Sequence, residues 1–125
     1  MQFKECYQNP FIEERADPYI TLGPDGFYYF TASYPMKSAD DKDGYDRVIL
    51  RRAKDISELA SAEEITIWKV ADTTLTHRFI WAPELHYIAG RWYVFYAGSE
   101  DKENNWAFDC HVLVCDSDDP YTGTW

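Results

Sequence analysis

The sequence predicts an all-β fold made of two successive antiparallel units of similar design. Aromatic residues occupy 18% of the 125 positions, and aromatic side chains favour strands. The apolar residues fall in short runs bounded by turn-forming or charged segments, which is typical of strands. The pattern of the first half also returns in the second half. With 46% hydrophobic residues, the chain can form a packed core, so we expect a folded chain of one domain at most.

Four strands are expected in the first half of the chain. They cover residues 18–21, 27–33, 47–52 and 65–70. A Gly-Pro-Asp-Gly turn at residues 23–26 separates the first two strands, and a charged loop at residues 37–46 separates the next two. Residues 55–64 have helical propensity and are expected to form a turn or one short helix. The last strand alternates apolar and polar residues at period two, as a half-buried strand does.

The second half repeats this order. Its expected strands cover residues 85–88, 92–97 and 111–115, with a tight turn at residues 89–90 and a polar loop at residues 99–107. The pattern of residues 27–32 returns 65 positions later, and that of residues 45–50 returns 63 positions later. The second unit stops at residues 123–125, where its fourth strand should begin.

A repeated four-stranded unit is typical of the blades of a β-propeller. Propellers have about 4–8 blades, whereas this chain holds fewer than two complete units. We therefore expect it to be the front part of a longer protein, with blade one at about residues 9–70 and an incomplete blade two at about residues 79–125. The alternative is one complete antiparallel sandwich of about seven strands.

Charge and cysteine content exclude several functional classes. The net charge of −10 argues against binding to nucleic acid or to a membrane surface, since both need clustered Lys and Arg. No apolar run approaches the roughly 20 residues of a membrane helix, and the first residues lack the features of a signal peptide.

The three cysteines, Cys6, Cys110 and Cys115, are an odd number without zinc spacing, so we expect reduced thiols in a cytoplasmic protein. We expect no metal and no cofactor, because the sequence has no phosphate-binding loop or similar motif.

Two carboxylates are candidates for catalysis. Asp17 lies at the start of the first strand of unit one, and Glu84 lies at the matching place in unit two. The first strand of each propeller blade lines the axis, so the two carboxylates would converge at one end of the channel. Like charges brought close raise the pKa of one member, which divides acid and base work between them. The alternative for Asp17 is an ordinary turn residue before a proline.

Two other side chains are weaker candidates for contact with a ligand. Trp81, close to Glu84, could stack on a sugar ring or fill the core. His77 precedes this segment and could make a polar contact.

Residues 9–20, 26–33 and 80–96 together resemble glycoside hydrolase family 43, and within it the exo-acting α-L-arabinofuranosidases. The resemblance implies a five-bladed propeller that hydrolyses arabinofuranosyl or xylosyl linkages with inversion. It implies that Asp17 is the general base and that Glu84 is a second acid, which tunes the general acid or contacts the substrate. Many members have Asp at that second position. Sugar-pocket positions would map onto Trp81, Ala82 and Tyr34.

The family's general acid is a Glu of the third blade, which would lie beyond Trp125. Inverting hydrolysis needs both carboxyl groups, so we expect the 125-residue chain to be inactive by itself. We expect it to self-associate or to pair with a polypeptide that completes the propeller. The substrate expected of the whole enzyme is a terminal α-L-arabinofuranosyl residue of arabinan or an arabino-oligosaccharide. The alternatives are a β-xylosidase of the same family and a non-catalytic carbohydrate-binding or assembly module.

Overall fold

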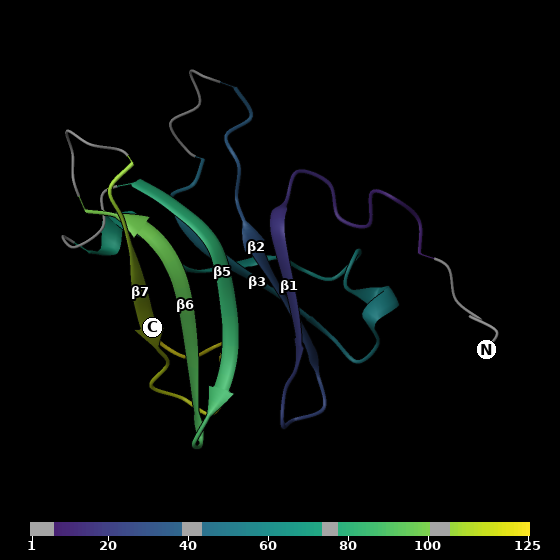
Figure 1. Cartoon of the computed structure of the whole chain (residues 1–125). Helices are drawn as coiled ribbons and strands as arrows, with labels where there is room; N and C mark the ends of the chain where they lie inside the picture. The colour runs from purple at the N-terminus through teal and green to yellow at the C-terminus, as the bar shows by residue number, and fades with distance from the viewer. Residues whose placement is uncertain (1–6, 39–43, 74–77, 101–105) are drawn as a thin grey trace, which may run out of the picture.

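The computed structural model describes residues 7–38, 44–73, 78–100 and 106–125, which form two antiparallel sheets (Figure 1). The first sheet has the order β1 (Ala16–Leu22), β2 (Tyr28–Ser33), β3 (Arg47–Ala53) and β4 (Ile65–Lys69). The second has the order β5 (Arg78–Ile88), β6 (Arg91–Ser99) and β7 (Phe108–Val114). Each strand pairs with its neighbour in sequence, so the prediction of two successive antiparallel sheets is confirmed. The exact blade limits of residues 9–70 and 79–125 remain a prediction.

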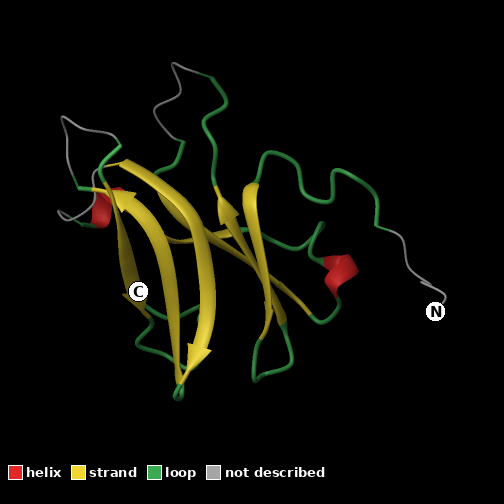
Figure 2. Ribbon diagram, viewed as in Figure 1, coloured by secondary structure: helices red, strands yellow, loops and turns green. Residues whose placement is uncertain are grey.

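Two short 3₁₀ helices are the only helices in these residue ranges, and they lie outside the sheets (Figure 2). They are η1 (Ile56–Glu58) and η2 (Val70–Asp72). The Asp55 side chain caps η1 by accepting a hydrogen bond from the Ser57 backbone N–H at 2.8 Å. The expectation of a turn or short helix at residues 55–64 is therefore confirmed. Neither helix is long and apolar enough to cross a membrane.

The main core lies between the two sheets. The first sheet contributes Tyr29, Val48, Leu50 and Trp68, and the second contributes Ile80, Leu85, Trp92, Val94 and Tyr96. The rings of Tyr29 and Trp92 meet edge to face with centroids 5.1 Å apart, a favourable arrangement for aromatic pairs. This shared core fixes the position of the second sheet against the first.

The first sheet is covered on its other face as well. Phe30, Ala32 and Ile49 are buried there beneath the segment that precedes β1, which supplies Phe11 and Ile12. Because both faces are covered, nearly every residue of β2 is buried. In the second sheet, β6 is covered on one face, so its side chains alternate between fully and partly buried.

β1 and β5 contain β-bulges, which the sequence did not predict. The register of β1 shifts between Ala16 and Tyr19, and that of β5 shifts on either side of Trp81. Asp17 in β1 and Ala82 in β5 have positive φ angles of 51° and 47°. Such angles are costly for residues other than glycine, and they are often found at functional sites.

Apolar side chains are exposed on the second sheet. Ile88 at the end of β5 is 49% exposed, and Val112 and Val114 on β7 are 50% and 39% exposed. An exposed apolar strand at a sheet edge favours association with another sheet. In a propeller of four-stranded blades the free edge of β7 pairs with the fourth strand of its own blade.

Candidate active site

β1 runs beside β5 (Figure 1), and Asp17 belongs to β1. Its Oδ2 accepts a hydrogen bond of 2.9 Å from the Ser33 hydroxyl at the end of β2. The same hydroxyl oxygen accepts a hydrogen bond of 2.8 Å from the Ala82 backbone N–H. Ser33 is fully buried. The predicted base of the first sheet is thus connected to the second sheet through one buried hydroxyl.

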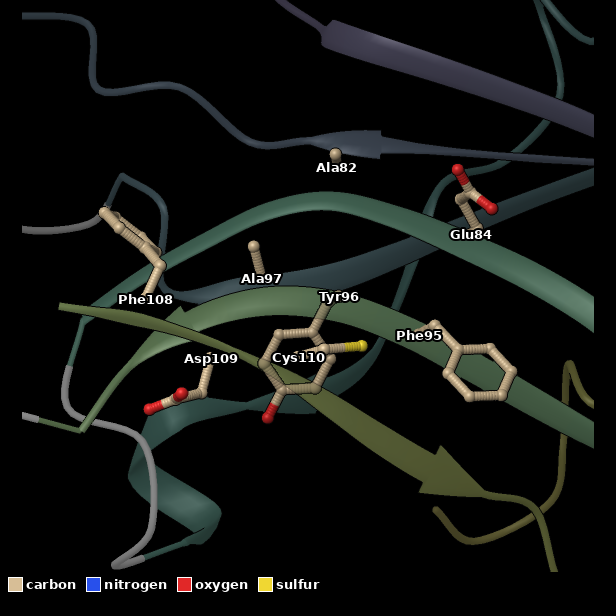
Figure 3. Close-up of a pocket in the computed structure, with 8 residues that line it drawn as sticks. All are labelled: Ala82, Glu84, Phe95, Tyr96, Ala97, Phe108, Asp109 and Cys110. Atoms are coloured by element: carbon tan, nitrogen blue, oxygen red, sulfur yellow. The ribbon is translucent and has the colours of Figure 1, made fainter. Parts of the chain in front are cut away.

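Glu84 is exposed on β5, and its Oε2 lies 3.1 Å from Nε2 of His86. The His86 ring in turn lies 5.3 Å from the ring of Tyr19 on β1. Glu84 and Ala82 also line a hollow of about 410 Å³ over the second sheet (Figure 3). The other lining residues come from β6 and β7: Phe95, Tyr96, Ala97, Phe108, Asp109 and Cys110. Asp17 does not line this hollow.

The register shows that Glu84 and Asp17 do not hold equivalent positions. Glu84 pairs with Phe95, which repeats Phe30 65 positions later, and Phe30 pairs with Ile20. Glu84 therefore corresponds to Ile20, three residues after Asp17, and the predicted match is wrong. β1 has a bulge between Ala16 and Tyr19 that matches the bulge of β5 between Trp81 and Glu84, so Asp17 corresponds to Trp81. A joint role for the two carboxylates stays a prediction.

Trp81 lies in a cluster of aromatic rings. Phe108 stacks on it with centroids 4.3 Å apart, and Phe79 and Tyr45 lie 5.5 and 5.8 Å away. Trp106, which is 79% exposed, forms the outer side at 6.1 Å. A cavity of about 220 Å³ opens between Trp81 and its neighbours Met36, Tyr45, Phe79 and Trp106. Since Phe108 covers one face of the indole, Trp81 serves the aromatic packing and has only part of its surface left for a ligand.

Tyr34 lies between charged groups. The guanidinium carbons of Arg15 and Arg47 lie 4.3 and 4.4 Å from the centre of its ring. Such cation–π contacts stabilise the ring where it is. The ring is therefore engaged with protein cations in this structure, and a sugar would have to share or replace these contacts.

Arg15 also belongs to an ion-pair network behind the site. It pairs with Glu64, and so does Arg51 on β3. Burial raises the pKa of the Glu64 carboxyl, but the hydrogen bonds and charges of the two guanidinium groups outweigh burial and bring this pKa below its usual value.

Of the other predicted positions, Ala82 contributes its backbone N–H, and its side chain lines the hollow. His77 lies outside the residues that the structure describes. Sequence reasoning missed Ser33, because a serine at a strand end carries no signal of its own. The only available clue was its place in the repeat, where Gly98 stands 65 positions later.

Comparison with known proteins places this chain in a family. The model of the family "Glycosyl hydrolases family 43" matches residues 7–125. The chain is 42% identical over 119 residues to extracellular exo-α-(1→5)-L-arabinofuranosidases of Streptomyces avermitilis and Streptomyces chartreusis. These matches cover 95% of the chain, which spans only 23% and 34% of the two relatives.

Solved structures show the same fold. The crystal structure of an α-L-arabinofuranosidase from Lactobacillus brevis matches 92% of the chain and 35% of its own length, with 39% identity and a TM-score of 0.73. A family 43 enzyme from Xanthomonas citri in complex with xylose matches with 20% identity and a TM-score of 0.69, covering 89% of this chain and 31% of its own. The two sheets are thus part of a five-bladed β-propeller.

The expected cytoplasmic location is wrong. Both Streptomyces relatives are named as extracellular enzymes. The expectation depended on unpaired cysteines, and Cys110 and Cys115 are indeed free thiols. A buried free cysteine such as Cys115 packs as a small apolar residue, so its presence does not report the redox state of a compartment.

Proposed function

Because the chain belongs to glycosyl hydrolases family 43, we propose that it supplies the N-terminal two blades of an inverting exo-α-L-arabinofuranosidase. The substrate class is a terminal α-L-arabinofuranosyl residue of arabinan or an arabino-oligosaccharide. This choice follows the two Streptomyces relatives and the Lactobacillus brevis structure, whose names describe arabinofuranosidases. The polypeptide or assembly that joins these two blades to the remaining ones is called the complete propeller below.

The observation that carries the proposal is the placement of Asp17. Its carboxylate lies at a bulge with positive φ and is tied to both sheets through Ser33. One oxygen is held by the hydroxyl, and the other has no hydrogen bond within the described ranges. A carboxylate held at one oxygen and open at the other can accept a proton from a water molecule.

In the proposed reaction Asp17 takes a proton from water while that water attacks the anomeric carbon. A carboxylic acid elsewhere in the complete propeller protonates the leaving oxygen. Inverting enzymes hold these two groups about 6.5–9.5 Å apart, so that water fits beside the sugar. Glu84 already bonds to His86 and does not occupy the position that matches Asp17. Of its two possible roles, contact with the substrate is therefore favoured over tuning of the acid.

Substrate choice and stereochemistry test this proposal. The complete propeller should hydrolyse an aryl α-L-arabinofuranoside with a higher kcat/KM than the matching aryl β-D-xyloside. Proton NMR during the reaction should show β-L-arabinofuranose as the first sugar released, because inversion reverses the anomeric configuration. A preference for the xyloside would favour a β-xylosidase, and release of the α-anomer first would contradict inversion. Sugar binding without turnover would favour a non-catalytic module.

A further inference from the structure

We propose that Ser33 is a positioning residue, which orients the Asp17 carboxylate and fixes it to the second blade. This inference depends on the proposed function, since it assigns Ser33 a role in the use of Asp17 as a base. The residues that carry it are Ser33, Asp17 and Ala82, which belong to β2, β1 and β5.

The direction of the hydrogen bonds follows from the chemistry of the three groups. The Ala82 backbone N–H can only donate, so the Ser33 oxygen must be the acceptor in their 2.8 Å contact. A hydroxyl has one proton, and this proton remains for the Asp17 carboxylate at 2.9 Å. Turning the Ser33 hydroxyl away would break both of these part-buried hydrogen bonds, which costs free energy.

Both strand bulges contribute to this arrangement. In β5, Ala82 lies between the paired residues Trp81 and Glu84, at a bulge where the ladder to β6 is interrupted. Ala82 has a positive φ of 47°, and its backbone N–H donates a hydrogen bond to Ser33 of the other sheet. In β1, the bulge at Asp17 brings the carboxylate to the same hydroxyl. Two strained residues thus meet at one buried side chain, and strain of this kind persists where the surrounding structure holds it.

The repeat supports a role specific to the first unit. By the strand register that aligns Ile20 with Glu84, Asp17 corresponds to Trp81 and Ser33 corresponds to Gly98. The second unit thus lacks both the carboxylate and the hydroxyl, although β2 and β6 have the same place in their sheets. If the serine only stabilised its strand, there would be no reason for it to occur in the unit that has the aspartate and not in the other unit.

The charge of Asp17 strengthens the contact. Ser33 is 0% exposed, whereas Asp17 is exposed, and a hydrogen bond to a charged group is stronger than one between neutral groups. Loss of this donor leaves the carboxylate free to rotate or to bind a different partner. A shift of about 1 Å in a catalytic group can cost up to about 10²-fold in rate.

The test compares Ser33→Ala with a matched control in the complete propeller. Thr31 lies two residues earlier on β2 and is 1% exposed, and its hydroxyl has no hydrogen-bond partner within the described ranges. Thr31→Val therefore removes a buried hydroxyl from the same strand without touching Asp17. We expect Ser33→Ala to lower kcat roughly 10–100-fold with KM changed by less than about threefold. Thr31→Val should keep kcat within about twofold.

A double variant separates positioning from general damage to the fold. In an Asp17→Asn background Ser33→Ala should lower kcat no further, because the group through which Ser33 acts has been removed. An equal loss in both backgrounds, or a kcat within about twofold of wild type for Ser33→Ala alone, would overturn the inference. If Ser33→Ala does not fold, Ser33→Cys replaces it, since a thiol has similar size but is a weak donor.

These results also distinguish the inference from the function on which it depends. Wild-type turnover in Asp17→Asn would refute Asp17 as the base and remove the basis for positioning. Loss of turnover in Asp17→Asn with normal turnover in Ser33→Ala would leave the proposed function intact and refute only the role of Ser33.

Discussion

Replacing Glu64 by glutamine tests how the segment before β1 is tied to the first sheet. Glu64 Oε2 accepts hydrogen bonds from Nε of Arg15 at 3.0 Å and from Nε of Arg51 at 3.1 Å. A second nitrogen of Arg15 bonds to Oε1. The glutamate side chain is 18% exposed, and the two arginine side chains are 12% and 14% exposed. One carboxylate thus balances two guanidinium groups that are largely removed from water.

The expected cost follows from these contacts. Hydrogen bonds to charged groups contribute about 1.5–3 kcal/mol each, and breaking a buried pair costs about 3–5 kcal/mol. Glutamine keeps the size of the side chain and can still accept one bond, and the site is partly open to water. We therefore expect a loss of about 2–4 kcal/mol in the free energy of unfolding, which lowers Tm by roughly 4–16 °C in a domain of a few hundred residues.

The assay is thermal unfolding of the complete propeller, with Glu63→Gln as the control. Glu63 is the exposed neighbour, so its substitution changes the net charge equally without breaking the network. Folding lowers the pKa of Glu64, so its stabilisation is complete above the usual value of about 4.5 and is lost as the pH falls through the folded-state pKa. The difference in Tm between Glu64→Gln and wild type should therefore shrink toward pH 3. Equal Tm values for the two glutamine variants at pH 7 would refute the reasoning.

Two further predictions concern the second sheet and the segment after it. Asp119→Asn should lower the free energy of unfolding by about 1 kcal/mol, measured by urea denaturation. The carboxylate accepts from the Tyr121 backbone N–H at 2.9 Å and from Arg52 at 2.9 Å, and its partial exposure reduces the effect. An unchanged midpoint and slope would contradict this contribution. The 125-residue chain alone should associate at micromolar concentration in analytical ultracentrifugation, and Val112→Lys, at a residue that is 50% exposed, should weaken the association. A wild-type chain that sediments as a monomer would contradict the expectation.

The strand order could be predicted from the sequence because local signals were consistent. Aromatic and β-branched runs, the Gly-Pro-Asp-Gly turn at residues 23–26 and the 65-residue repeat all indicate hairpins. Strand ends were less accurate, and β5 begins at Arg78 rather than near residue 85. Pro83 and two bulges interrupt the alternation of this strand, so a period-two pattern could not reveal its first half.

The candidate site was only partly predictable for the same physical reason. Asp17 could be singled out because its Ala-Asp-Pro motif is visible in the sequence. The position of Glu84 could not be predicted, because the register between paired strands is not visible in an alignment of the two halves. Ser33 is joined to Ala82 across 49 residues, and such a contact depends on how two sheets pack.

The central claim is that this chain supplies the general base of an arabinofuranosidase, and Asp17→Asn tests it most directly. The measurement is kcat on an aryl α-L-arabinofuranoside for the complete propeller, with Tm recorded for both proteins. An amide cannot take the proton from water, so kcat should fall about 10²–10⁴-fold while Tm stays close to that of wild type. A folded Asp17→Asn enzyme with near-wild-type kcat would contradict the claim.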